Sequence, residues 1–156
     1  MMTIIALDPG RTVGWATFKK PNARDGYKSG QIKWDATWSL LDSALIETHD
    51  IHLVVESFKH RQLPKIDYTP VEVIGVVKEW ARQNDVNITW QTPSQAKFFW
   101  TDERLKDYTL YRPGKPHAND AMRHLLYYLN FHPSGRLLGE GVIENGSNQP
   151  FSSERR

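Results

Sequence analysis

Three acidic residues stand where apolar segments end, and together they predict a metal site. Asp8 follows the apolar run 3–7, Glu56 follows 53–55, and Asp120 lies early in a predicted C-terminal helix. Two carboxylates 4 Å apart repel by about 4 kcal/mol at an effective dielectric of 20, so a cluster of them implies a divalent cation. Oxygen ligands favour Mg²⁺ or Mn²⁺, and two such ions about 4 Å apart support phosphodiester hydrolysis.

Each acid also has a simpler interpretation. Asp8 can open a β-turn with Pro9 and Gly10, Glu56 can be a solvated acid at a strand end, and Asp120 can cap a helix. These separate explanations do not account for two hydrophobic strands that both stop at an acid. The combination therefore favours the metal site.

The elements that position these acids follow from hydrophobic periodicity and turn residues. We expect strands over 3–7, 13–18, 29–34, 52–57 and 87–91, and helices over 36–48, from Pro70, after 92–94 and over 116–130, with Asp35 as the cap of the first helix. Right-handed crossover geometry makes the fourth strand parallel to the first. The order predicts an α/β fold in which helices pack on a mixed sheet, with one domain over 1–133 and a flexible tail over 134–156.

The composition narrows the class of protein. The chain has 156 residues, a net charge of +2 and no cysteine. It has neither an apolar run long enough to span a bilayer nor a recognisable signal peptide, so we expect no membrane association and a reducing cytoplasm as the location. The basic excess falls within 58–116, which suits a polyanionic partner.

Several segments resemble the motifs of RuvC-type Holliday junction resolvases in the correct order. LDPGRTVGWA resembles the opening motif, LVVES the second and PHANDAMRHLLYYL the closing helix, while TPVEVIGVVKEWA and TPSQAKFF resemble the pieces between. The resemblance covers about residues 3–130. It implies a ribonuclease H-like fold with a five-stranded mixed sheet, a homodimer, a divalent metal and hydrolysis of four-way (Holliday) DNA junctions. The compact size and the tail suggest a bacteriophage version.

His117 departs from the family pattern, which has an acid at this position. It stands three residues before Asp120, so the two side chains share one helix face. A neutral imidazole can bind a second metal, position water or protonate a leaving group. A purely structural histidine is the alternative.

The loop after Glu56 combines an aromatic residue with positive charges. We expect Phe58 to stack on an unpaired base and Lys59, Arg61 and Lys65 to hold phosphates, although a solvated loop with Phe58 in the core is equally consistent. Lys97 matches a DNA-contacting helix start of the family. Three other candidate DNA contacts are Arg11 and Thr12, beside Asp8, and Lys115, in the final loop.

Other classes of protein share part of this sequence pattern. The Asp-x-Gly motif also resembles the phosphate loop of actin-like ATPases, but these need two lobes and a second such loop. A ribonuclease H-like or flap nuclease on the same fold remains open, whereas the retained Asp8, Glu56 and Asp120 argue against a DNA-binding protein without activity. Beyond the metal, we expect branched DNA as the partner and no small-molecule cofactor.

Overall fold

The computed structural model describes residues 2–19, 26–59 and 65–135 as a five-stranded sheet flanked by helices. The strand order is β3-β2-β1-β4-β5, in which β1 is antiparallel to β2 and parallel to β4. The strands are β1 (Thr3–Asp8), β2 (Thr12–Lys19), β3 (Tyr27–Lys33), β4 (Ile51–Glu56) and β5 (Asn87–Gln91). The helices are α1 (Thr37–Glu47), α2 (Thr69–Gln83), α3 (Pro93–Phe99), α4 (Asp102–Asp107) and α5 (Pro116–Phe131).

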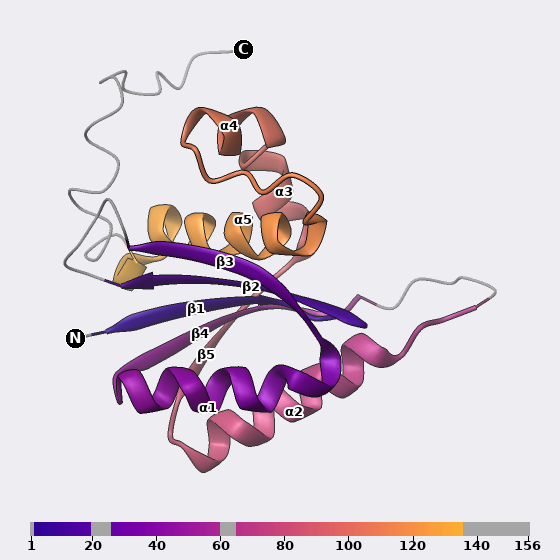
Figure 1. Ribbon diagram of the computed structural model, residues 1–156, viewed down its shortest axis with the longest axis vertical. Helices are drawn as coiled ribbons and strands as arrows, with labels where there is room; N and C mark the ends of the chain where they lie inside the picture. Colours follow the sequence, from indigo (N-terminus) through magenta and orange to yellow (C-terminus); the bar gives the residue numbers. More distant parts are fainter. Residues whose placement is uncertain (1, 20–25, 60–64, 136–156) are drawn as a thin grey trace.

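Helices cover both faces of the sheet, which explains why the central strand is apolar throughout (Figure 1). Helices α1 and α2 lie on one face, and α5 lies on the other with α3 and α4 beside it. Alternate residues of β1 enter different cores: Ile4 and Ala6 pack with α5, whereas Ile5 and Leu7 pack with α1 and α2. A strand buried on both faces reads as a continuous hydrophobic run instead of an alternating one.

The predicted mixed sheet and the parallel pairing of the first and fourth strands are confirmed. The predicted cap of the first helix is wrong. A 3-10 turn over Trp34–Ala36 follows β3 directly, so Asp35 lies inside this turn, and Ala36 precedes α1 without a side-chain cap. The hydroxyl of Thr37 instead donates to the Trp34 carbonyl oxygen over 2.7 Å.

The described chain continues slightly beyond the predicted domain boundary at residue 133. Gly135 is buried, and a Cβ added there would lie 2.2 Å from the carbonyl oxygen of Tyr128, so this residue packs closely on α5. The remainder of the predicted tail, 136–156, lies outside the described residues. None of the described helices is long and apolar enough to cross a membrane.

The beginning of α5 sits directly on β2 at Gly14. A Cβ added to Gly14 would lie 1.8 Å from the carbonyl oxygen of His117, closer than any side chain tolerates. Gly14 is also the register partner of Asp8 in the antiparallel pair. The absent side chain therefore lets the first turn of α5 approach the end of β1.

We predict that Gly14→Ala lowers the free energy of unfolding by about 3 kcal/mol, because backbone atoms of α5 must move to admit the methyl group. Urea denaturation measures this loss. Gly75→Ala is the matched control: Gly75 is exposed in α2 with nothing near its Cβ position, so this substitution should add about 0.5–1 kcal/mol. Equal stabilities of Gly14→Ala and wild type would contradict the close approach.

His52, near the start of β4, makes folding sensitive to acid. Its ring stacks on Tyr128, which also stacks on His132, and its Nε2 lies 2.8 Å from the Thr89 hydroxyl. Burial, reinforced by the nearby charge of His132, lowers the pKa of His52 below its ordinary 6.5. The unfolded chain therefore takes up a proton at this residue at a higher pH than the folded chain does.

We expect the free energy of unfolding to fall as the pH drops from about 6.5 through the lowered folded-state pKa of His52. His52→Gln should make this decline shallower, because glutamine does not titrate. The exposed His49 provides the comparison variant His49→Gln, which makes the same chemical change at a surface position. Chemical denaturation at a series of pH values measures the free energy of unfolding. If it falls with pH equally steeply in wild type and in His52→Gln, His52 is not the source of the acid sensitivity.

Candidate active site

Strand alternation directs two acids toward α5. Asp8 continues the set Ile4 and Ala6 of β1, and Glu56 continues Val54 of β4, all of which face the α5 side of the sheet. Because β1 and β4 are parallel neighbours, both acids end at the same sheet edge, as the sequence predicted. Asp8 is only 6% exposed.

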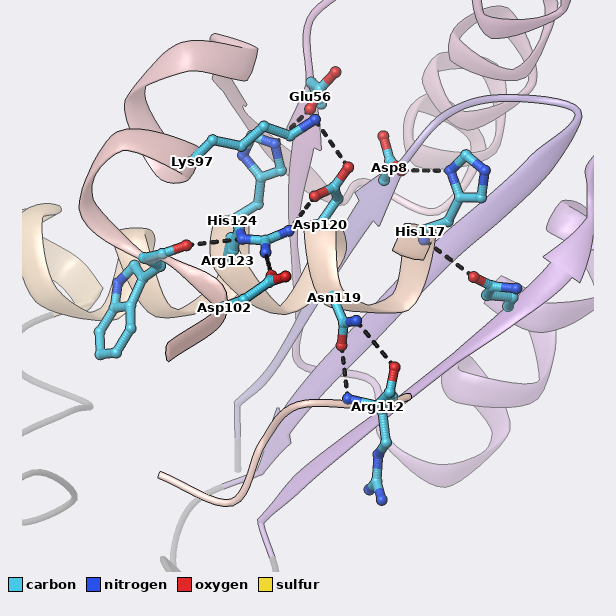
Figure 2. Close-up of polar contacts among 12 residues, drawn as sticks. Asp8, Glu56, Lys97, Asp102, Arg112, His117, Asn119, Asp120, Arg123 and His124 are labelled. Atoms are coloured by element: carbon cyan, nitrogen blue, oxygen red, sulfur yellow. Dashed lines mark hydrogen bonds and ion pairs between the residues drawn. The ribbon is translucent and has the colours of Figure 1, made fainter. Parts of the chain in front are cut away.

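One face of α5 supplies a partner to each of these acids (Figure 2). His117, in the first turn, places Nδ1 2.9 Å from Oδ2 of Asp8. His124, two turns further on, places Nε2 2.7 Å from Oε2 of Glu56. Asp120 lies between them, three residues after His117 and four before His124, so the three side chains form a stripe along the helix.

Asp120 is held by two cationic side chains. Lys97 of α3 places Nζ 2.8 Å from Oδ2, and Arg123 donates to Oδ1. Arg123 also donates to the Trp100 carbonyl oxygen over 2.7 Å and to Asp102, the first residue of α4. The guanidinium thus joins the acid of α5 to the segment between α3 and α4 (Figure 2).

The charges of Glu56 and Asp120 affect the pKa of Asp8. Burial raises the pKa of Asp8; the hydrogen bond from His117 opposes this rise, and the charges of Glu56 and Asp120 add to it. The hydrogen bond to Asp8 in turn raises the pKa of His117. The three predicted acids and His117 therefore lie close enough together to interact electrostatically.

Lys97 interacts electrostatically with the same three acids. Burial is the largest single influence and would lower the pKa of its ammonium group, but the hydrogen bond to Asp120 and the charge of Asp120 oppose it, and the net effect raises the pKa. The charges of Glu56 and Asp8 act in the same direction. A lysine surrounded by three carboxylates offsets part of their mutual repulsion.

The donor set fits a hard divalent cation, although it is not assembled as a metal cluster. Among the described residues, no group of three or more His, Cys, Asp or Glu side chains is close enough to hold an ion. The contacts above engage one oxygen each of Asp8 and Glu56, but both oxygens of Asp120. Carboxylates of Asp8 and Glu56 suit Mg²⁺ or Mn²⁺, and each oxygen of Asp120 already accepts from a cationic side chain, Lys97 or Arg123.

Four of the predicted DNA contacts gather beside Glu56. A cavity of about 350 Å³ is lined by Glu56 together with Phe58, Lys59, Lys65 and Lys97. Phe58 is half-buried at its wall, whereas Lys59 and Lys65 are exposed. The lining also includes Asp67, but an aromatic ring and three ammonium groups beside Glu56 suit a phosphate backbone and a base.

The other predicted contacts are distributed differently. Arg11 is exposed and pairs with Asp67 over 3.0 Å, and Thr12 is the half-buried first residue of β2. Lys115 is exposed immediately before α5. None of these three lines the cavity, and Arg61 lies outside the described residues.

The sequence interpretation missed the partners of Glu56 and Asp120. His124 and Arg123 lie four and three residues after Asp120, which puts them on its side of the helix. Helical spacing from Asp120 was therefore a usable signal for both. Gln91 carried no comparable signal, because only the β4–β5 register brings it opposite Glu56.

Comparison with known proteins shows the class of fold. No protein-family model matches the chain, and no curated protein matches it significantly. Among solved structures, RuvC of Thermus thermophilus in complex with a Holliday junction substrate aligns over 82% of this chain and 94% of its own, with 14% identity and a TM-score of 0.62. A second Thermus thermophilus RuvC structure aligns over 81% and 95%, with 16% identity and a TM-score of 0.60.

The chain therefore has the ribonuclease H-like fold of RuvC, as its motifs predicted. The likeness extends over nearly the whole RuvC chain, so it concerns the complete fold and not one shared motif. At 14% and 16% identity, this likeness establishes the fold but neither the activity nor the substrate.

We predict that Asp8→Asn raises the free energy of unfolding at pH 7 in metal-free buffer. The substitution removes a buried charge that Glu56 and Asp120 repel, while an amide oxygen can still accept from His117. Asp67→Asn is the control: the Asp67 carboxylate is exposed, and its bonds from Thr69 lower its pKa, so its loss should destabilise slightly. A lower free energy of unfolding for Asp8→Asn than for wild type would contradict this prediction. The hydrogen bond from His117 would then stabilise the charged Asp8 by more than burial and repulsion destabilise it.

Proposed function

We propose that this protein is a metal-dependent endonuclease that resolves four-way DNA junctions by phosphodiester hydrolysis. The observation that carries the proposal is the convergence of Asp8, Glu56 and Asp120 at one edge of a ribonuclease H-like sheet. The fold is shared with a RuvC whose structure contains a Holliday junction substrate. The cationic and aromatic cavity beside Glu56 supports a nucleic-acid substrate.

In this proposal the carboxylates of Asp8 and Glu56 hold Mg²⁺ or Mn²⁺. Bound there, the metal supplies Lewis-acid stabilisation of the phosphate and a more acidic water. We propose two ions per site, and the second would require an oxygen of Asp120, which Lys97 and Arg123 occupy here. Asp120 would bind this ion through a lone pair that these contacts leave available, or after one of the two side chains moves.

The remaining side chains act on the substrate directly. Lys97, beside Asp120, can transfer its ammonium contact to a phosphate oxygen and offset the charge that develops there. His117, bonded to Asp8 and with a 42% exposed side chain, is reachable by solvent and can pass a proton to a leaving oxygen. Phe58 at the cavity wall can stack on a base that the junction leaves unpaired.

The assembly and source remain predictions. A four-way junction is roughly two-fold symmetric, so a homodimer would present one site to each of two opposed strands. The proposed DNA contacts of Arg11, Thr12, Arg61 and Lys115 rest on their positions in the sequence near the predicted site, and the bacteriophage origin rests on the compact size and the predicted tail.

We predict that the purified protein cuts a four-way junction in Mg²⁺ or Mn²⁺ and does not cut it in EDTA. Asp8→Asn, Glu56→Gln and Asp120→Asn should each reduce cleavage by at least about a hundredfold, since each removes a metal-binding charge. Junction affinity should be kept or increased, because fewer negative charges face the phosphates. Gel assays of binding and cleavage measure both quantities.

Glu79→Gln is the control and should cut normally, because Glu79 is an exposed acid of α2 that pairs with Arg82 and does not line the cavity. A panel of flap, duplex and RNA/DNA hybrid substrates tests the alternatives. Faster cutting of flaps or hybrids than of junctions would transfer the assignment to another nuclease on this fold. Binding without any cleavage would indicate a DNA-binding protein instead.

A further inference from the structure

His124 is a completely buried polar side chain whose two ring nitrogens both face other polar groups. Its residue is 0% exposed, in a stretch of α5 where its neighbours Leu125 and Leu126 belong to the core. Burying an imidazole is costly unless its nitrogens are paired. A hydrophobic residue would fill this space without that requirement, so the histidine calls for an explanation other than packing.

The ring bridges the ends of two adjacent strands. Glu56 and Gln91 are register partners in β4 and β5, and Gln91 is itself buried. Nε2 of His124 lies 2.7 Å from Oε2 of Glu56, and Nδ1 lies 2.8 Å from Oε1 of Gln91. A carboxylate can only accept, so Nε2 carries the donated proton, while the amide of Gln91 can complement either state of Nδ1.

We propose that His124 and Gln91 form a positioning pair that fixes the carboxylate of Glu56 in its metal-binding orientation. Gln91 holds the ring of His124, which engages Oε2 from the protein interior, so in this proposal Oε1 is the oxygen that binds the metal. A glutamate side chain has several rotatable bonds, and restraining them in advance removes an entropic cost of binding. The inference rests on the proposed function, because it presumes that Glu56 binds a metal ion.

Comparison of the three acids supports a special role for this pair. The partner of Asp8, His117, has a 42% exposed side chain, and Lys97, a partner of Asp120, has a 47% exposed side chain. Both can leave their acid and contact substrate. His124 is sealed in the interior and cannot reach substrate, so its effect on the reaction passes through Glu56 alone.

Two substitutions separate positioning from packing. His124→Leu puts an apolar side chain of similar bulk in the core and removes the N–H donor. His124→Gln restores a donor near the position of Nε2. His52→Leu is the matched control. His52 is a half-buried histidine on the α5-facing side of the sheet that packs on Tyr128, at the opposite end of β4 from Glu56.

Binding of Mn²⁺ alone, followed by electron paramagnetic resonance, is the first readout, and the Mn²⁺ concentration for half-maximal junction cleavage is the second. We expect His124→Leu to weaken Mn²⁺ binding about 10- to 100-fold while junction affinity stays unchanged. His124→Gln should recover most of the loss, and His52→Leu should match wild type. Wild-type Mn²⁺ affinity in His124→Leu, or an equal loss in His52→Leu, would overturn the proposal.

If His124→Leu does not fold cooperatively, Gln91→Leu tests the pair from its other end. This variant leaves Glu56 and His124 in place but removes the group that orients the ring, so weaker Mn²⁺ binding is again expected, and wild-type affinity would overturn the inference. The proposed function fails separately: a wild-type protein that neither binds Mn²⁺ nor cuts junctions would refute it before any variant is compared.

Discussion

Bringing three carboxylates to one sheet edge is electrostatically unfavourable, and the way α5 relieves this repulsion organises the rest of the molecule. His117 and His124 each donate to one strand acid, while Asp120 between them is neutralised by Lys97 and Arg123. For Asp8, burial and the charges of the other two acids raise the pKa, and the hydrogen bond from His117 opposes that rise. The position of α5 is therefore as important to the site as the acids themselves.

That position depends on two residues that are not acids, Gly14 and Asn119. Gly14 admits the first turn of α5 beside Asp8, and the buried Asn119 binds the backbone of Arg112 at both its nitrogen and its oxygen, over 2.8 and 3.0 Å. Asn119 thereby fixes the chain where it enters the helix (Figure 2). The same helix buries Leu125 and Leu129 against the sheet, so core packing and site geometry share one element.

Much of this architecture could be predicted from local patterns. The apolar run before Asp8 and the crossover before Glu56 were sufficient to predict adjacent parallel strands, and helical spacing placed His117 with Asp120. The failures have physical causes. Asp35 looked like a cap because local sequence does not reveal that a 3-10 turn follows β3 directly, and the pairing of Gln91 with Glu56 depends on a register between strands that are far apart in sequence.

The central claim is that Asp8 and Glu56 form a divalent metal site at the edge of this sheet, and anomalous diffraction from a crystal soaked in Mn²⁺ tests it most directly. Our account predicts an anomalous peak in contact with carboxylate oxygens of both residues, with Oε2 of Glu56 still bonded to His124. A crystal in which Mn²⁺ binds only exposed acids such as Asp67 or Glu79, with no peak between β1 and β4, would contradict it.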